Sequence, residues 1–174
     1  QTIRAPHVTI NTIALPASNI LQGANKQPIY AFQINAEDPF QLEYIFFKSS
    51  GTYNTTDFVD FNLYSNTTNS LETAELIGYF YTSPVTGAGQ ILKLGGTNTP
   101  IPIGTKYYWI TGRLSETAVD GNTIKINGAD TQVFIDGFNS TPTIINNQSD
   151  IAGTQTIRAP HVTINTIALP ASNI

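Results

Sequence analysis

Residues 30–35 read YAFQIN, a run in which a large apolar side chain occupies every second position. Tyr30, Phe32 and Ile34 share one parity, and smaller or polar residues fill the other. Because successive side chains of a β-strand point to opposite faces of the sheet, this alternation predicts a half-buried strand. The same period of two recurs along most of the chain, which predicts an all-β protein.

Strand-like runs are separated by short turn signals such as Ser49-Ser50-Gly51 and Asn127-Gly128. Helical periodicity is nearly absent, and its best candidate, 70–77, is short. Short strands at this spacing predict an antiparallel β-sandwich of the immunoglobulin-like kind. The other expected strands are 7–15, 41–48, 59–64, 76–81, 90–94, 107–112, 123–126 and 131–135.

The segment QTIRAPHVTINTIALPASNI fills residues 1–20 and returns unchanged as residues 155–174, an offset of 154 positions. Drift between the copies of an old duplication would have broken so long an identity. We therefore expect the chain to come from an array of near-identical units, the pattern of tandem-repeat proteins. The alternative is a deliberate duplication of one strand that lets the fold be completed from either end.

We expect one complete immunoglobulin-like repeat at 1–153, with a body at 21–137 and an Asn-, Ser- and Thr-rich linker at 138–154. Residues 155–174 would then be the first strand of the next repeat. Short connections favour the N-terminal copy as the edge strand of the body. If the C-terminal copy took that place, neighbouring repeats would be joined by strand exchange. The apolar residues of this inter-repeat strand are Val8, Ile10, Ile13 and Leu15, repeated as Val162, Ile164, Ile167 and Leu169.

The opening strand carries a change of phase. Val8 and Ile10 share one parity, whereas Ile13 and Leu15 have the other. Either a β-bulge or a strand that passes from one sheet to the other would account for the change.

The composition argues against several functional classes. Charged residues make up 11% of the chain, the net charge is −4, and the cations are scattered singly. Neither nucleic acid nor an anionic membrane surface is expected to bind, because both require clustered positive charge. No apolar run is long enough to span a membrane, and Cys and Met are absent.

Catalytic patterns are also missing. The chain contains His7 and its copy His161 as its two histidines, and no G-x-S-x-G sequence. A sialidase would need an arginine cluster, but one period holds Arg4 and Arg113 alone. We therefore expect no enzyme and no cofactor. Calcium is the one metal considered, because hard carboxylate oxygens are its usual ligands. Its candidate ligands are Glu37, Asp38, Asp57, Asp60, Asp120 and Asp136.

Aromatic side chains are numerous, and most are expected in the core. The runs 79–81 and 107–109 have aromatic residues at both parities, so that one face of each strand should point outward. Exposed rings can stack on sugars. Tyr79, Tyr81 and Tyr108 are therefore candidate glycan contacts.

Three segments carry a resemblance to a known family: NILQGANKQPIYAFQI at 19–34, SSGTYNTTDFVDFNLYSN at 49–66 and GTKYYWITGRLSETAVDGNTI at 104–124. Their order resembles the immunoglobulin-like repeat of very large Bacteroidota surface proteins, the domain associated with BNR-repeat neuraminidases. The resemblance covers about 19–135. It implies an extracellular protein exported by the type IX route, with relatives that act in adhesion and gliding motility. It implies no catalytic activity in the repeat itself.

The sequence thus predicts a structural or adhesive repeat of a long extracellular surface fibre, whose partners are neighbouring identical repeats. Two alternatives remain open. The unit could be a carbohydrate-binding module with exposed aromatic residues and surface glycans as partners, or a non-catalytic accessory domain of a secreted glycosidase.

Overall fold

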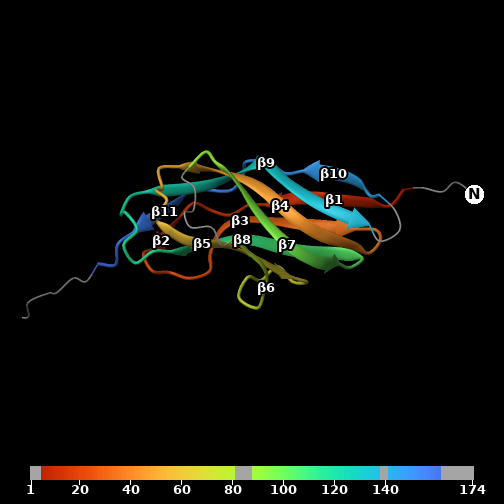
Figure 1. Cartoon of the computed structure of the whole chain (residues 1–174), viewed down its shortest axis with the longest axis horizontal. Coiled ribbons are helices and arrows are strands. Elements are labelled where there is room, and N and C mark those ends of the chain that lie inside the picture. Colours follow the sequence, from red (N-terminus) through yellow and green to blue (C-terminus); the bar gives the residue numbers. More distant parts are fainter. Residues whose placement is uncertain (1–4, 81–87, 138–140, 162–174) are drawn as a thin grey trace, which may run out of the picture.

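A computed structural model describes residues 5–80, 88–137 and 141–161. All regular elements in these ranges are strands, which lie in two sheets (Figure 1). The described residues contain no helix that is long and apolar enough to cross a membrane. The strands are β1 (His7–Ile13), β2 (Ser18–Leu21), β3 (Gln27–Ala36), β4 (Phe40–Gly51), β5 (Phe58–Asn66), β6 (Glu75–Phe80), β7 (Ile91–Ile101), β8 (Gly104–Leu114), β9 (Thr123–Gly137), β10 (Thr143–Asn147) and β11 (Gln155–Arg158).

The first sheet has the strand order β10-β1-β3-β8-β5-β6, and the second has the order β2-β11-β9-β4-β7. Most neighbours are antiparallel. The exceptions are β1 with β10 and β11 with β2, which run parallel. Both parallel pairs join a strand from the start of the chain to one from its end. The terminal segments of the chain therefore form one edge of each sheet.

The main core lies between the two sheets. Tyr30, Phe32 and Ile34 are fully buried there, as the alternation in β3 predicts. Phe32 stacks on Tyr108 with ring centroids 5.0 Å apart. Phe47 of the second sheet contacts the ring of Phe61 in the first sheet edge-on. These contacts confirm the predicted all-β sandwich.

A smaller apolar cluster covers the opposite face of the first sheet. It is built around Trp109, Ala31 and Ala74, and Ile13 and Leu15 pack against it. Val8 and Ile10 belong to the main core instead. The pairing of β1 with β3 runs without a register shift from Val8 to Ile13. The change of phase therefore reflects apolar contacts on both faces of one regular strand, and no bulge is needed.

Several elements differ from the sequence-based expectation. The weak helical candidate at 70–77 contains a turn and the start of β6. Val59 is 48% exposed, because the pairing of β5 with β8 shifts register between Phe58 and Asp60. The runs 123–126 and 131–135 form one long strand, β9. The strands β2, β10 and β11 were not expected as separate elements.

The entry and exit of the sandwich lie at opposite ends of its long axis. Figure 1 shows β1 beginning at one end and β11 leading out at the other. Successive units of this shape would therefore follow one another end to end without a long connection.

Candidate functional site at the closing strand

The N-terminal copy of the duplicated segment supplies two strands. Its middle forms β1, where Val8 and Ile10 are buried. Its end forms β2 in the other sheet, where Ile20 is buried. The N-terminal copy thus supplies an inner strand of the first sheet, β1 between β10 and β3, and the edge strand β2 of the second sheet. Val162, Ile164, Ile167 and Leu169 of the C-terminal copy lie outside the described residues.

The first four residues of the C-terminal copy form β11 within the same sandwich. This strand lies between β2 and β9, parallel to the first and antiparallel to the second. Ile157 is fully buried in the main core, and Gln155 is 2% exposed. The two copies therefore meet in one sheet, the beginning of one copy beside the end of the other.

The Gln155 side chain fixes this meeting. Its amide nitrogen Nε2 donates to the carbonyl oxygens of Pro16 (3.0 Å) and Gly153 (3.1 Å), and its Oε1 accepts from the hydroxyl of Ser18. A buried amide is costly unless its groups are bonded, and here both ends of the amide are. Gly153 allows the close approach, because a Cβ at this position would lie 2.2 Å from the backbone nitrogen of Ala17.

Backbone bonds continue along the exit. Ile157 donates to the carbonyl of Asn122 (2.8 Å) and accepts from the amide of Gly121 (2.9 Å). The Ala159 amide then donates to Asp120 Oδ1 (2.9 Å). A matching contact exists at the entry, where the His7 amide donates to Glu37 Oε2 (3.1 Å). A carboxylate thus accepts the amide of the residue after the first Ala-Pro dipeptide, 5–6, and another accepts the alanine amide of the second, 159–160.

These placements differ from the boundaries expected from the sequence. Residues 143–147, within the expected linker 138–154, form β10 and extend the first sheet through β1. Gln155–Arg158, expected to begin the next repeat, pair inside this sandwich. The physical reason is that the backbones of both segments form hydrogen bonds with neighbouring strands, and that the Ile157 side chain is buried in the core.

A buried hydroxyl network ties the last segment to β1 and β3. The Tyr30 hydroxyl lies 2.8 Å from Thr12 Oγ1 and donates to Gln148 Oε1 at 3.0 Å. Thr12 Oγ1 also accepts the Ser149 amide at 2.9 Å. Burial raises the pKa of Tyr30 to about 12, and the hydrogen bond between Tyr30 and Thr12 opposes this shift. The segment after β10 is thereby held against the sandwich.

Asp57, a candidate calcium ligand, is fully buried and bonded to protein donors. Its carboxylate accepts the amides of Asn54 and Val119 and the side-chain amide of Asn122, each at 2.7 Å. These bonds link the turn before β5 to the turn before β9. Asp57 is therefore a structural acceptor, and its oxygens are already in use.

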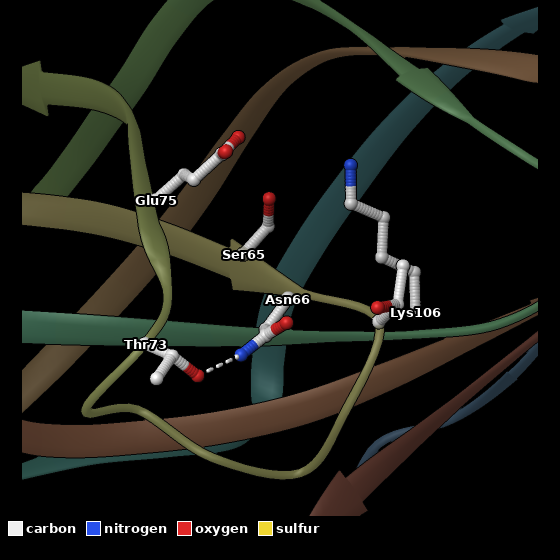
Figure 2. A pocket seen from close by; sticks show the side chains of 6 residues that line it. Ser65, Asn66, Thr73, Glu75 and Lys106 are labelled. Atoms are coloured by element: carbon white, nitrogen blue, oxygen red, sulfur yellow. Dashed lines mark hydrogen bonds between the residues drawn. The ribbon is translucent and has the colours of Figure 1, made fainter.

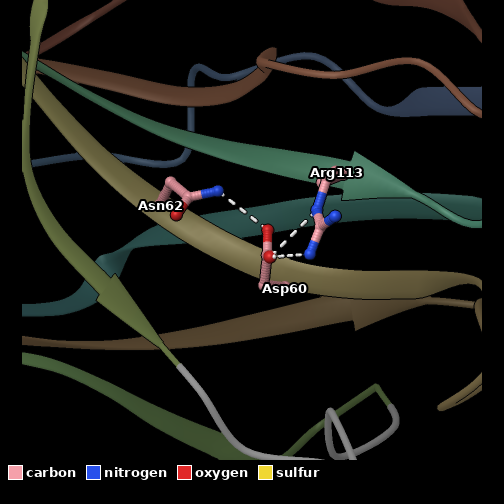
Figure 3. A network of polar contacts seen from close by, with 3 residues as sticks. All are labelled: Asp60, Asn62 and Arg113. Carbon is pink, nitrogen blue, oxygen red and sulfur yellow. Dashed lines mark hydrogen bonds and ion pairs between the residues drawn. The ribbon is translucent and has the colours of Figure 1, made fainter.

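Asp60 forms an ion pair with Arg113 across β5 and β8 (Figure 3). Its Oδ2 accepts from Nη2 (2.6 Å) and Nε (3.0 Å) of Arg113, and its Oδ1 accepts from Asn62 (2.8 Å). Across the described ranges, no group of three or more His, Asp or Glu side chains is arranged to hold a metal ion.

A polar recess of about 180 Å³ opens beside the loop after β5 (Figure 2). Glu75 and Lys106 both line it, and Asn66 donates to Thr73 at its rim (2.9 Å). Burial lowers the pKa of Lys106, against the opposing effect of Glu75. The Lys106 ammonium already donates to the carbonyl of Pro100 (3.1 Å).

The three predicted glycan contacts are not brought together. Tyr108 is fully buried between the sheets, so it cannot meet a sugar, and burial raises its pKa. Tyr79 is 53% exposed on β6. Tyr81 lies outside the described residues.

An aromatic group that the sequence pattern did not predict lies on the outer face of the second sheet. Tyr44 and Phe46 of β4 were expected in the core, but both are only partly buried, as is Phe134 of β9. Tyr44 stacks on Phe134 with centroids 4.3 Å apart, and Phe46 meets both rings edge-on. Their equal parity on β4 was the signal that could have found them.

Comparisons with known proteins give no family for this chain. No family model matches it, and no curated protein matches it. Among solved structures, it is similar to the third cohesin ScaC of Acetivibrio cellulolyticus, solved with the ScaB dockerin, at 9% identity and a TM-score of 0.28 over 87% of this chain and 99% of that one. A non-cellulosomal cohesin from Archaeoglobus fulgidus gives 15% identity and a TM-score of 0.32 over 87% and 91%. Neither likeness is close enough to transfer a binding surface to this chain.

Proposed function

We propose that this chain is one repeat of a long extracellular fibre or adhesin, in which each unit runs from Ala5 to Arg158. One period of 154 residues counted from Ala5 ends at Arg158, the last residue of β11. The observation that carries the proposal is that the first four residues of the second copy pair inside this sandwich as β11, with Ile157 in its core. In an array, QTIR would close one repeat and HVTINTI would open the next.

The chain path supports a mechanical role. Between the closing strand and the next opening strand there are only the residues Ala159 and Pro160. Proline fixes its own φ angle, and the Ala159 amide is held by Asp120. Entry and exit at opposite ends of the sandwich would let the length of a fibre grow in proportion to the number of repeats.

The array would be displayed at a bacterial surface after export by the type IX route, as the resemblance implies. Its partners would be neighbouring repeats of the same chain. Strand exchange would be confined to cases in which a unit lacks its own QTIR at the end and accepts that of another molecule.

The test is the shape of a two-repeat chain, made by continuing residues 1–158 with a second copy of 5–158. Small-angle X-ray scattering should give a maximum dimension close to twice that of one unit, and a narrow distribution of shapes. A broad distribution centred on bent forms would contradict a stiff spacer. A carbohydrate-binding role is favoured by a separate observation, which follows.

A further inference from the structure

Strands β4, β7 and β9 place both apolar and polar side chains on the outer face of the second sheet. Phe46 of β4 is paired with Gln132 of β9 on one side and with Lys93 of β7 on the other. Next to this row, Tyr44 is paired with Phe134. The Lys93 ammonium lies 4.1 Å from the Tyr44 ring centroid and 5.6 Å from that of Phe46. The Tyr44 ring is thus engaged by Phe134 and Lys93.

A recess of about 310 Å³ adjoins this row and is lined by Phe46, Ile91, Asp130 and Gln132. Ile91 is 70% exposed. The pairing of β4 with β9 shifts register between Phe46 and Lys48, which leaves 128–131 outside the regular ladder. Such irregularities redirect side chains, and here one places Asp130 at the edge of the recess.

We propose that this recess binds a neutral, gluco-configured oligosaccharide. The ring face of an aromatic side chain is negative and attracts the C–H groups of a sugar ring. A gluco-configured pyranose has its hydroxyls equatorial, so both of its faces offer only C–H groups to Phe46. The equatorial hydroxyls point outward in the plane of the sugar, where a carboxylate and an amide can meet them.

The polar residues of the recess select the ligand. Asp130 can accept hydrogen bonds from sugar hydroxyl groups, and Gln132 can both donate and accept them. Gln132 is exposed and lines the recess, so its amide can reach a ligand. The Asp130 carboxylate and the net charge of −4 disfavour acidic sugars through like-charge repulsion. The volume falls at the lower end of the range for small-molecule pockets, about 300–1,000 Å³, which suits one or two sugar rings.

The test is isothermal titration calorimetry of the full chain with cellotetraose and laminaritetraose, and with trigalacturonic acid as the charged comparison. At least one neutral probe should bind, and trigalacturonic acid should not. Phe46→Ala should weaken binding at least tenfold, and Gln132→Ala severalfold. The matched control is Leu76→Ala, an exposed apolar residue of β6 on the other sheet, which should bind like the parent chain.

Circular dichroism and thermal unfolding would establish that each variant is folded, and Gln132→Ala keeps the test valid if Phe46→Ala is unstable. The proposal is overturned if neither neutral probe binds at millimolar concentration, or if the acidic probe binds as well as the neutral ones. It is equally overturned if Leu76→Ala loses the same affinity. Self-association in sedimentation velocity that Phe46→Ala abolishes would assign the face to a second copy of the chain. None of these outcomes depends on the existence of an array.

Discussion

Ile157 is paired with Ile20 in the parallel ladder between β11 and β2, and both side chains are buried in the main core. Ile20 ends the first copy of the duplicated segment, whereas Ile157 stands near the beginning of the second. The two copies are therefore complementary parts of one fold. We expect each copy in an array to be shared between two units.

This relationship predicts different effects for the same substitution at two identical positions. Ile157→Ala should lower the free energy of unfolding by about 2–5 kcal/mol, because it leaves a cavity in the core. Ile3→Ala, in the copy of the same four residues that precedes the proposed unit, should change it by less than about 0.5 kcal/mol. Urea denaturation of both variants gives the comparison. Equal effects would count against a boundary at Arg158.

The buried carboxylate of Asp57 should be essential for the turns that it connects. Asp57→Ala removes the buried acceptor of three hydrogen bonds, and we expect a loss of about 3 kcal/mol. Asp136→Ala is the control, because that carboxylate is exposed and accepts the amide of the neighbouring Gly137. Calcium titration of the parent chain should not raise the Tm. A calcium-dependent stabilisation lost in Asp57→Ala would instead make Asp57 a ligand.

Stability should fall at alkaline pH. The folded state holds the Tyr30 proton up to about pH 12, whereas the unfolded chain releases it near 10. The folded state therefore binds more protons between these values, and the stability present below pH 10 is lost as the pH rises through that window. The Tyr30 contribution is about 2–3 kcal/mol, from two pKa units.

Tyr30→Phe tests this assignment. The variant should be less stable than the parent at pH 7, because the bonds to Thr12 and Gln148 are lost. It should also show a shallower fall between pH 10 and 12 in denaturation experiments. A slope identical to that of the parent would mean that other groups, such as the buried Tyr108, carry the whole alkaline effect.

Asp120 should control order at the exit. Its carboxylate accepts the Ala159 amide, so Asp120→Ala should speed hydrogen exchange of that amide while the exchange of Ile157 stays slow. Asp120→Asn retains an acceptor oxygen, so its Ala159 amide should exchange at a rate between those of the parent chain and Asp120→Ala. If Ala159 exchanges at the same rate in all three chains, Asp120 does not hold the exit.

The strand pattern could be predicted from the sequence because burial in this fold is strongly one-sided in places. Tyr30, Phe32 and Ile34 are buried, as their parity predicts. Parity fails in β8, where Tyr108 faces the main core and Trp109 packs against the second cluster. When both faces of a strand are covered, alternation does not indicate which face is outward, so Tyr108 was wrongly assigned to the surface.

The closing strand could not be predicted from its own residues. QTIR has one apolar residue in four, too few for a period of two to be visible. Its place depends on distant partners: Gln155 is buried because Pro16 and Ser18 bond its amide, and Ile157 because Ile20 lies beside it. These contacts depend on long-range strand pairing, which the sequence pattern does not show. The duplication of 20 residues suggested instead that the whole segment 155–174 belongs to the next repeat.

Two chains of identical composition test the central claim most directly. Residues 1–154 and residues 5–158 contain the same 154 residues, with QTIR at the start of one and at the end of the other. Thermal unfolding of both should be measured at several protein concentrations. We predict that 5–158 unfolds at the Tm of the full chain, independently of concentration. The 1–154 chain should unfold at a lower Tm that rises with concentration, as QTIR of one molecule closes another. The same concentration-independent Tm for both would contradict a unit that is closed by Gln155–Arg158.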